Sequence, residues 1–173
     1  MDLATRAAKI KLLILDVDGV LTDNRLFYGD NGVEYKSFYT RDGHAMVLWR
    51  KSGLDLGVIT GRKSQLVTQR MNDLKVKYLF QGVPDKLPVF EQLLQDEGLQ
   101  ADEIAYMGDD ILDLPILTRV GLASCPKDAD PEVIKRVHFV SEKVGGQGAV
   151  RELIEMILKT QGHWQAHMDF YLR

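Results

Sequence analysis

The sequence predicts an α/β fold with a doubly wound parallel sheet, and three observations support that prediction. Short apolar runs alternate with longer amphipathic segments along most of the chain. The apolar runs are continuous rather than alternating, which is typical of strands covered on both faces. Strand and helix patterns follow one another in turn, and that order favours right-handed strand–helix–strand units within one sheet.

Each predicted strand is a short apolar run, and each predicted helix is a longer amphipathic segment. The strands are residues 11–15, 56–60, 76–80, 104–107, 120–124 and, as a short sixth, 138–141. The helices are residues 43–51, 63–73, 87–97, 110–119 and 149–159. In the third helix, for example, one face carries Leu87, Phe90, Leu93 and Leu94. We therefore expect a Rossmann-like sheet that is covered by helices.

Two segments break this alternation. Residues 25–40 contain two β-rich runs around the GDNG sequence at 29–32, which predicts an inserted β-hairpin. Residues 162–173 form a tail with no clear period, so both disorder and docking stay open for it. Its aromatic side chains, Trp164, Phe170 and Tyr171, favour docking.

Size and composition limit the class of protein. The chain is long enough for one domain, which we expect to span residues 1–173. Its residues are 45% hydrophobic and 27% charged, which suffices for a full core and argues against wholesale disorder. A net charge of −3 argues against a sequence-independent nucleic-acid binder, which is usually basic. The single cysteine, Cys125, excludes a disulfide framework and fits a reducing compartment.

No segment of the sequence predicts export or a membrane anchor. Residues 1–11 contain no long apolar run of the kind found in signal peptides. No apolar run approaches the roughly 20 residues that a membrane span needs. We therefore expect a cytoplasmic protein that has neither a membrane nor a nucleic acid as its partner.

Polar and charged residues follow the ends of four predicted elements. Ligands of open α/β sheets bind beyond the carboxyl ends of the strands, so these positions form the candidate site. In chain order they are Asp16 and Asp18, then Thr60, Gly61 and Arg62, then Lys86, and finally Asp109, Asp110 and Asp113. Four separate segments thus bring carboxylates, a hydroxyl group and cations to one edge of the sheet.

This set of side chains predicts metal-assisted phosphoryl transfer. Clustered carboxylates repel one another unless a positive charge lies among them. Oxygen ligands suit a hard cation, and a few carboxylates together with waters and a phosphate suit Mg²⁺. A carboxylate can also act as the nucleophile and form an aspartyl-phosphate. The metal and a lysine would then neutralise charge on the transferring group.

Four motifs in order resemble those of haloacid dehalogenase-type phosphatases. They are DVDGVLTD at 16–23, TGR at 60–62, Lys86 and GDDILD at 108–113. Together with the hairpin, TRDGHA at 40–45 and GGQGAVRE at 145–152, they make residues 10–158 similar to the lidless sugar-acid phosphatases of that superfamily. The resemblance implies hydrolysis of the phosphate ester of an eight-carbon 2-keto-3-deoxy sugar acid in lipopolysaccharide synthesis. A related nine-carbon 2-keto sugar acid phosphate is the alternative substrate.

The resemblance also implies a role for each residue of the motifs. Asp16 attacks phosphorus, while Asp18 protonates the leaving sugar oxygen and later deprotonates the hydrolytic water. Thr60 and Lys86 hold the phosphate, and Lys86 also restrains Asp16. The implied Mg²⁺ ligands are the Asp16 side chain, the Asp18 backbone carbonyl and Asp109.

The remaining motif residues have supporting roles in this interpretation. Asp110 and Asp113 orient water or the lysine of the third motif, although aspartate near a helix N-terminus is favourable in any protein. Gly61 gives the phosphate access to the backbone, and Arg62 is expected to contact substrate, with an ordinary surface arginine as the alternative. The GGQG sequence at 145–148 suits either anion binding at a helix start or, more commonly, a flexible turn.

The spacing of the motifs leaves no room for a cap domain. The first and second motifs begin 44 positions apart, at residues 16 and 60, and the third follows 26 positions later at residue 86. Phosphoryl transfer profits from the exclusion of water, so a neighbouring subunit would have to cover the site. The resemblance implies a homotetramer with residues 25–40 as the assembly element, and it places residues 145–148 near a neighbour's active site.

A phospho-accepting receiver module is the main alternative from another functional class. Receivers also use aspartates, a threonine and a lysine on a parallel sheet with Mg²⁺. Their acceptor aspartate follows the third strand, however, whereas here the paired aspartates follow the first. Asp18 would also supply a general acid and base that a long-lived phosphoprotein does not need. A catalytically silent subunit is disfavoured because every expected catalytic position is filled.

Overall fold

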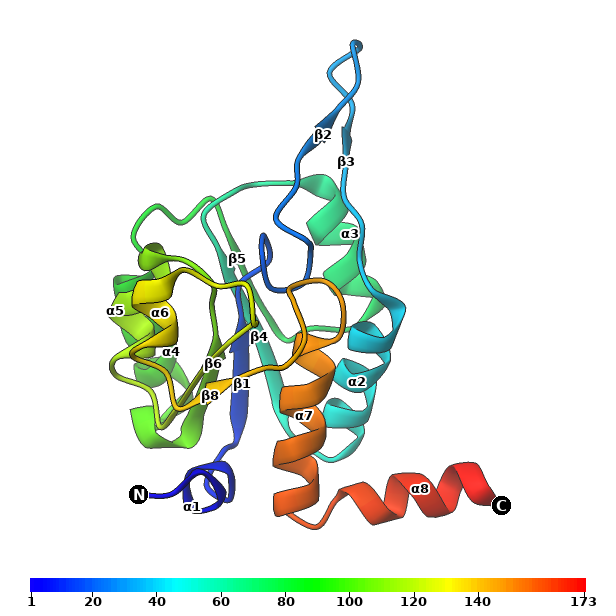
Figure 1. Cartoon of the computed structure of the whole chain (residues 1–173), viewed down its shortest axis with the longest axis vertical. Coiled ribbons are helices and arrows are strands. Elements are labelled where there is room, and N and C mark those ends of the chain that lie inside the picture. Colours follow the sequence, from blue (N-terminus) through cyan, green and yellow to red (C-terminus); the bar gives the residue numbers. More distant parts are fainter.

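A six-stranded parallel sheet forms the centre of the molecule, in a computed structural model that describes all 173 residues. The strand order is β5-β4-β1-β6-β7-β8, and every neighbouring pair is parallel. Helices cover both faces of this sheet (Figure 1). The predicted doubly wound α/β fold is thereby confirmed. The strands are β1 (Leu12–Leu15), β4 (Asp55–Thr60), β5 (Tyr78–Gln81), β6 (Ile104–Met107), β7 (Leu122–Cys125) and β8 (Phe139–Val140).

The central strand β1 is buried on both faces, which explains its continuous apolar sequence. Leu13 and Leu15 belong to one core cluster, which also contains side chains from α2, α3 and α7. Leu12 and Ile14 belong to the other, with side chains from α4 and α5. Successive strand residues face opposite sides, so a strand between two helix layers must be apolar throughout. The helices are α2 (Thr40–Lys51), α3 (Gln65–Asp73), α4 (Lys86–Glu97), α5 (Leu114–Leu117) and α7 (Ala149–Thr160).

The strand order places the candidate residues together. From β1 the chain builds β4 and β5 on one side and then returns to build β6, β7 and β8 on the other. The direction of winding therefore reverses at β1, and such a switch point opens a crevice at the carboxyl ends of the strands. The loops after β1, β4 and β6 carry three of the four motifs and meet at this crevice.

Several helix boundaries differ from the prediction. The structure divides the predicted helix at 110–119 into a 3₁₀ turn, η2 (Ile111–Asp113), and the short α5. The cause is Asp113, whose Oδ2 accepts the backbone N–H groups of Asp109 (3.0 Å) and Asp110 (3.3 Å) and so holds this turn in a 3₁₀ geometry. The sequence analysis also missed short elements that hold too few residues to show a period. They are α1 (Leu3–Ala7), η1 (Ala101–Glu103) and α6 (Pro131–Ile134).

The predicted hairpin is present and stands beyond the carboxyl edge of the sheet (Figure 1). Its strands, β2 (Phe27–Tyr28) and β3 (Glu34–Tyr35), pair antiparallel, and the turn closes with a 2.8 Å bond from Gly29 N–H to the Val33 carbonyl. Thr40, which we assigned to the hairpin, already begins α2. No cap domain accompanies the hairpin. Five of its apolar side chains are 40–62% exposed, namely those of Leu26, Phe27, Tyr28, Val33 and Tyr35.

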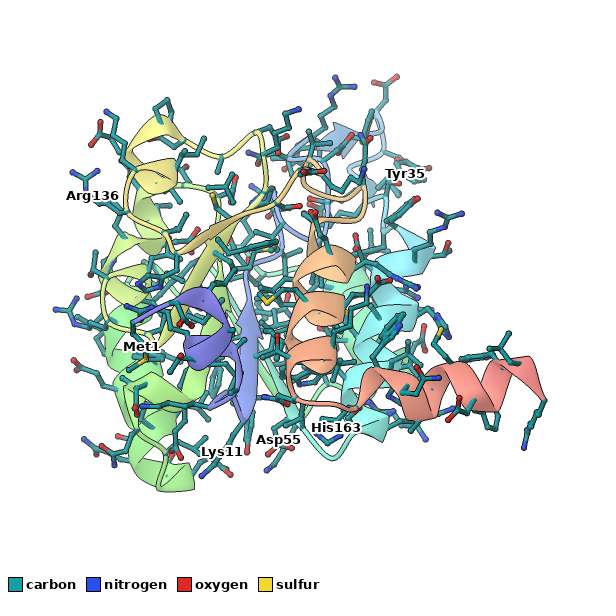
Figure 2. The ribbon with its side chains drawn as sticks, turned by 60° about the horizontal axis from the view of Figure 1, so that its bottom comes forward. Met1, Lys11, Tyr35, Asp55, Arg136 and His163 are labelled. Atoms are coloured by element: carbon teal, nitrogen blue, oxygen red, sulfur yellow. The ribbon has the colours of Figure 1, made fainter.

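The C-terminal tail is a helix, α8 (Trp164–Leu172), which leaves the end of α7. Figure 2 shows His163, just before α8, at the same end of the molecule as Lys11 and Asp55, opposite Tyr35 of the hairpin. The helix contacts α2 and the residue after it: the Tyr171 hydroxyl lies 2.8 Å from His44 Nε2, and His167 Nε2 lies 2.8 Å from Ser52 Oγ. Trp164 packs against the core, whereas Phe170 and Tyr171 stay about half exposed. Docking, rather than disorder, is therefore the outcome for the tail. No helix in the chain combines the length and the apolar character that crossing a bilayer requires.

Candidate active site

A cavity of about 140 Å³ opens at the carboxyl ends of the strands, where the motif loops meet. Of the predicted site residues, Asp113 alone does not line it, because it lies fully buried behind the cavity. Two residues that we did not predict, Asn24 and Leu112, complete the wall. The full lining is Asp16, Asp18, Asn24, Thr60, Gly61, Arg62, Lys86, Asp109, Asp110 and Leu112.

Two glycines allow the loop after β1 to pack closely on its neighbours. Gly19 has φ +90° and lies against the Asp109 carboxylate, which a Cβ atom at this position would strike. Gly145 packs against the backbone carbonyl of Gly19, so a side chain there would push the loop away. Asp128 Oδ1 accepts the Gly145 N–H at 2.9 Å and so holds the loop that contains Gly145 in place. The glycines at 145 and 19 therefore set the position of the Asp16–Asp18 loop.

The carboxylate of Asp42 occupies the N-terminus of α7, where the GGQG sequence was expected either to bind an anion or to form a flexible turn. This buried carboxylate, on α2, accepts the N–H groups of Gly148 (3.2 Å) and Arg151 (2.8 Å) at the start of α7. The helix N-terminus thus already has an anionic cap from within the chain. The flexible turn is also a poor description, because Gly145 is closely packed.

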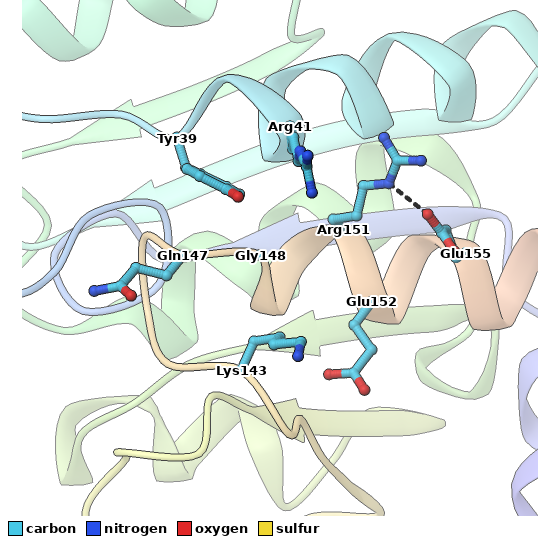
Figure 3. A pocket seen from close by; sticks show the side chains of 8 residues that line it. All are labelled: Tyr39, Arg41, Lys143, Gln147, Gly148, Arg151, Glu152 and Glu155. Carbon is cyan, nitrogen blue, oxygen red and sulfur yellow. Dashed lines mark hydrogen bonds and ion pairs between the residues drawn. The ribbon is translucent and has the colours of Figure 1, made fainter.

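A separate cavity of about 350 Å³ lies beside the start of α7 (Figure 3). Arg151 and Glu155, one turn apart on α7, form an ion pair at its edge, so part of the arginine's charge is neutralised within the helix. None of the predicted site residues lines this larger cavity. Its lining is Tyr39, Arg41, Lys143, Gln147, Gly148, Arg151, Glu152 and Glu155.

Lys86 is a buried cation that joins two of the predicted aspartates. It is the first residue of α4, where Asp85 caps the helix by accepting the Leu87 N–H at 3.2 Å. Its Nζ lies 3.1 Å from Asp16 Oδ1 and 2.7 Å from Asp113 Oδ1. Burial disfavours its charge, but the carboxylates of Asp113 and Asp16 outweigh burial and raise the pKa of Lys86. The lysine is therefore positively charged at neutral pH.

Asp113 has hydrogen-bond donors on both of its oxygens. Oδ1 accepts from Lys86 Nζ and from the Tyr106 hydroxyl at 2.6 Å. Oδ2 accepts the two backbone N–H groups that shape η2. The carboxylate is thus fully used in holding the lysine and the loop after β6. The orienting role that we expected for Asp113 stays a prediction.

Asp16 and Asp109 differ from Asp113 because each keeps a buried oxygen without a hydrogen-bond donor. Those atoms are Asp16 Oδ1 and Asp109 Oδ1, since the Lys86 contact at 3.1 Å misses hydrogen-bond geometry. One oxygen from each of the three aspartates lies within 4.8 Å of the others. Buried carboxylates this close together, two of them with an oxygen that lacks a hydrogen-bond donor, fit a hard divalent cation.

The charge balance of the cavity supports the same conclusion. Burial, with the Asp16 and Asp113 carboxylates next, raises the pKa of Asp109 to about 8. Burial and the Asp113 charge also raise the pKa of Asp16, against the opposing effect of Lys86. Negative charge therefore exceeds what Lys86 alone can neutralise, and a bound cation would restore the ionised form of both groups.

Asp18 lies on the outer side of the cavity and contacts two cations. Lys36 Nζ, from the segment after β3, forms an ion pair with Asp18 Oδ1. Arg62 Nε lies 3.8 Å from Asp18 Oδ2, which agrees with the predicted position of this arginine at the site. The sequence analysis missed Lys36 because it assigned the whole hairpin to assembly.

Asn24 and Tyr106 support the aspartates of the site through hydrogen bonds, whereas Asp110 does not. Asn24 donates from Nδ2 to Asp109 Oδ2 at 3.2 Å, and its place directly after the first motif was the signal that could have identified it. Tyr106 supports Asp113 from within β6, where an apolar run concealed it. Asp110, in contrast, is exposed and caps η2 by accepting the Ile111 N–H at 2.6 Å. Its contribution to the cavity is therefore mainly one of charge.

Curated relatives cover nearly the whole chain. The 3-deoxy-D-manno-octulosonate 8-phosphate phosphatase KdsC of Yersinia pestis is 41% identical over 160 residues, which are 92% of this chain and 86% of that protein. KdsC of Escherichia coli K12 is 42% identical over 161 residues, or 93% and 86%. The chain belongs to the KdsC family. No family model matches the chain.

Solved structures of KdsC phosphatases have the same fold. The Moraxella catarrhalis enzyme, in complex with magnesium, phosphate and KDO, has a TM-score of 0.95 at 34% identity, with 97% of each chain covered. The cobalt-bound Haemophilus influenzae enzyme has a TM-score of 0.87 at 38% identity and covers 91% of this chain and 92% of its own. Both of these neighbours hold a divalent metal, and the aspartates of this chain are arranged in a way that fits one. A Legionella pneumophila protein described as a haloacid dehalogenase superfamily hydrolase has a TM-score of 0.95 at 39% identity and covers 98% of this chain and 93% of its own, so the resemblance to that superfamily is confirmed.

Proposed function

We propose that the protein hydrolyses 3-deoxy-D-manno-octulosonate 8-phosphate to the free sugar acid and phosphate, with Mg²⁺, in lipopolysaccharide biosynthesis. The observation that carries the proposal is the meeting of Asp16, Asp18, Lys86 and Asp109 around one cavity. Membership of the KdsC family supports the choice of substrate. A nine-carbon 2-keto sugar acid phosphate would use the same catalytic residues and is the alternative.

In the first chemical step, an Asp16 carboxylate oxygen attacks phosphorus. The bond from phosphorus to the sugar oxygen breaks while the bond to Asp16 forms, which gives an aspartyl-phosphate. Asp18 donates a proton to the leaving sugar oxygen, so that an alcohol leaves rather than an alkoxide. Lys86, beside Asp16, supplies positive charge to the transferring phosphoryl group.

In the second step, water hydrolyses the aspartyl-phosphate. Asp18, now ionised, takes a proton from the water as its oxygen attacks phosphorus, and the bond to Asp16 breaks. Inorganic phosphate leaves, Asp16 returns to its carboxylate form, and Asp18 is protonated for the next turnover. The same residue thus serves as acid and then as base.

Metal and phosphate contacts complete the proposed site. The side chains of Asp16 and Asp109, with the Asp18 backbone carbonyl, would hold Mg²⁺, which adds positive charge beside the transferring phosphate. Thr60, at the end of β4, and Gly61 would hold the phosphate together with Lys86. Arg62 lies farther out, where it would contact the sugar acid.

We also propose a homotetramer that assembles through the hairpin and works in the cytoplasm. The chain has no cap domain to close the cavity, and the hairpin exposes a row of apolar side chains around β2 and β3. Exposed apolar patches of this kind are usually covered by a partner. A mass of about four chains in solution, measured by light scattering, tests the assembly.

Phosphate release from a panel of sugar phosphates with Mg²⁺ tests the activity. The panel contains the eight-carbon and nine-carbon 2-keto acid phosphates and common hexose phosphates, and Asp16→Asn serves as the inactive variant. Strong preference for the eight-carbon substrate, lost in Asp16→Asn, supports the whole proposal. Preference for the nine-carbon substrate would change the proposed substrate but keep the proposed mechanism. If no phosphate were released from any compound, the proposed phosphatase activity would be overturned.

A further inference from the structure

The hairpin contains one buried charge, although most of its surface is exposed. The side chain of Lys36, directly after β3, is only 1% exposed. Its Nζ forms an ion pair with Asp18 Oδ1 and lies 3.6 Å from Glu34 Oε1. The lysine therefore reaches from the hairpin to the cavity and ends on the residue that is proposed to move the proton.

This arrangement differs from an ordinary surface ion pair. A long lysine side chain on a solvent-exposed hairpin would normally keep its ammonium group in water, because burying a charge is costly unless it is paired. Surface pairs of this type contribute little and leave both side chains mobile. Here the ammonium group is withdrawn from water and held between two carboxylates, so its position is specific.

The hairpin also holds the second cation that faces Asp18. Arg62 Nη2 donates to the Tyr28 hydroxyl at 2.6 Å and to Glu34 Oε1 at 3.4 Å. Tyr28 and Glu34 belong to β2 and β3, so both strands of the hairpin are fastened to the mouth of the cavity. Glu34 Oε1 lies within 3.6 Å of Lys36 Nζ and 3.4 Å of Arg62 Nη2, so one carboxylate oxygen links the two cations that face Asp18.

We propose that Lys36 is a positioning residue for Asp18. Its ammonium group fixes Oδ1 and so sets the orientation of the carboxylate. Oδ2 then remains as the oxygen that exchanges protons with the leaving sugar oxygen and with water, because its 3.8 Å contact with Arg62 Nε is too long for a hydrogen bond. A general acid works only within hydrogen-bond reach of the atom that it protonates, so orientation decides its effect. The inference rests on the proposed function, and it makes the hairpin a structural part of the active site.

A pair of substrates separates this role from a general effect on the fold. A sugar phosphate needs a proton on its leaving oxygen, whereas p-nitrophenyl phosphate loses a phenolate that leaves without one. We expect Lys36→Met, which keeps the aliphatic stem, to lower kcat/KM for the sugar phosphate by roughly 10- to 100-fold, part of what general acid catalysis supplies. For p-nitrophenyl phosphate we expect a fall of less than about 3-fold, because the first step then needs no acid.

The control is a lysine–aspartate pair away from the site. Lys9 Nζ lies 3.0 Å from Asp102 Oδ2 with both side chains substantially exposed, and Lys9→Met should leave both substrates unaffected. Equal losses on both substrates in Lys36→Met, or no loss on either, would overturn the positioning role. Failure of the unchanged protein to release phosphate would instead count against the proposed function.

A crystal structure of Lys36→Met gives a readout that does not depend on turnover. The proposal expects the Asp18 carboxylate to rotate away from its present orientation while Asp16, Lys86 and Asp113 keep theirs. An Asp18 carboxylate that stays in place without the ammonium group would refute the inference. If Lys36→Met does not fold, Lys36→Ala, which leaves no side-chain donor to hold Asp18 Oδ1, answers the same question.

Discussion

Two buried lysines contact aspartates of the same cavity, but they come from different parts of the molecule. Lys86 begins a helix of the core and is held by Asp16 and Asp113, with the Tyr106 hydroxyl behind. Lys36 comes from an exposed hairpin and is held by Asp18 and Glu34. The first is enclosed by the fold itself, whereas the second is enclosed only because the hairpin lies against the cavity.

The comparison indicates a division of work between the two lysines. Lys86 neutralises the innermost carboxylates, so both the fold and the chemistry depend on it. Lys36 contacts the outer carboxylate, which water can reach, so we expect the chemistry to depend on it more than the fold does. Two predictions compare the lysines directly, and two more, on Asp113 and Asp109, test the buried network around Lys86.

Lys86→Met should damage both activity and stability. Loss of the cation beside the phosphoryl group should lower kcat by at least roughly 100-fold, as removal of one strong electrostatic contact does elsewhere. Breaking a buried ion pair should also lower the free energy of unfolding by about 3–5 kcal/mol, less whatever Asp16 and Asp113 recover by taking up protons. Phosphate release and urea unfolding measure the two effects.

Lys36→Met provides the contrast for that variant. Its free energy of unfolding should fall by less than that of Lys86→Met, because the partly exposed Asp18 carboxylate can be hydrated once the ammonium group is gone, whereas Asp16 and Asp113 stay buried. Equal destabilisation by the two substitutions would contradict the distinction between a lysine of the core and a lysine of the hairpin.

Asp113→Asn should cause the next largest loss of stability after Lys86→Met. The carboxylate accepts from donors on both oxygens, whereas an amide places its own NH₂ group against one set of donors. We expect a loss of about 2–3 kcal/mol in the free energy of unfolding, since buried donors are left unpaired. Urea unfolding measures it, with Asp96→Asn as the control, because Asp96 is exposed and accepts only from Gln92. A loss no larger than that of the control would contradict the buried network.

The smallest expected signal is the release of protons when Mg²⁺ binds. In the metal-free protein Asp109 has a pKa of about 8, so at pH 7 it is mostly protonated and must lose its proton to bind the cation. Release should be near one proton at pH 7 and much less at pH 9, and the affinity for Mg²⁺ should rise with pH up to about 8 and then level off.

Calorimetry in two buffers with different heats of ionisation measures that release. Asp109→Asn has no proton to lose at this position and should remove most of the signal. Release that stayed the same between pH 7 and pH 9 would show that another group supplies the proton.

Local patterns in the sequence were enough to predict the sheet, the motif residues and the chemistry that they suggest. The apolar runs located all six strands of the main sheet, and the motif spacing located Asp16, Thr60, Lys86 and Asp109. These signals are local, because a strand between two helix layers must be apolar and a motif is a short run of residues. The carboxyl ends of parallel strands then meet at one edge for any sequence with this strand order.

Which side chains from distant segments complete the site depends on the tertiary structure. Asp42 caps α7 from a position 106 residues before Gly148, and Lys36 meets Asp18 across a hairpin whose placement no local pattern records. The predicted helix at 110–119 divides because Asp113 bonds to backbone groups and to Lys86 at once. The physical reason is common to all three. A buried charge or polar group must find its partner wherever the packed chain places one, and that place is a property of the whole fold.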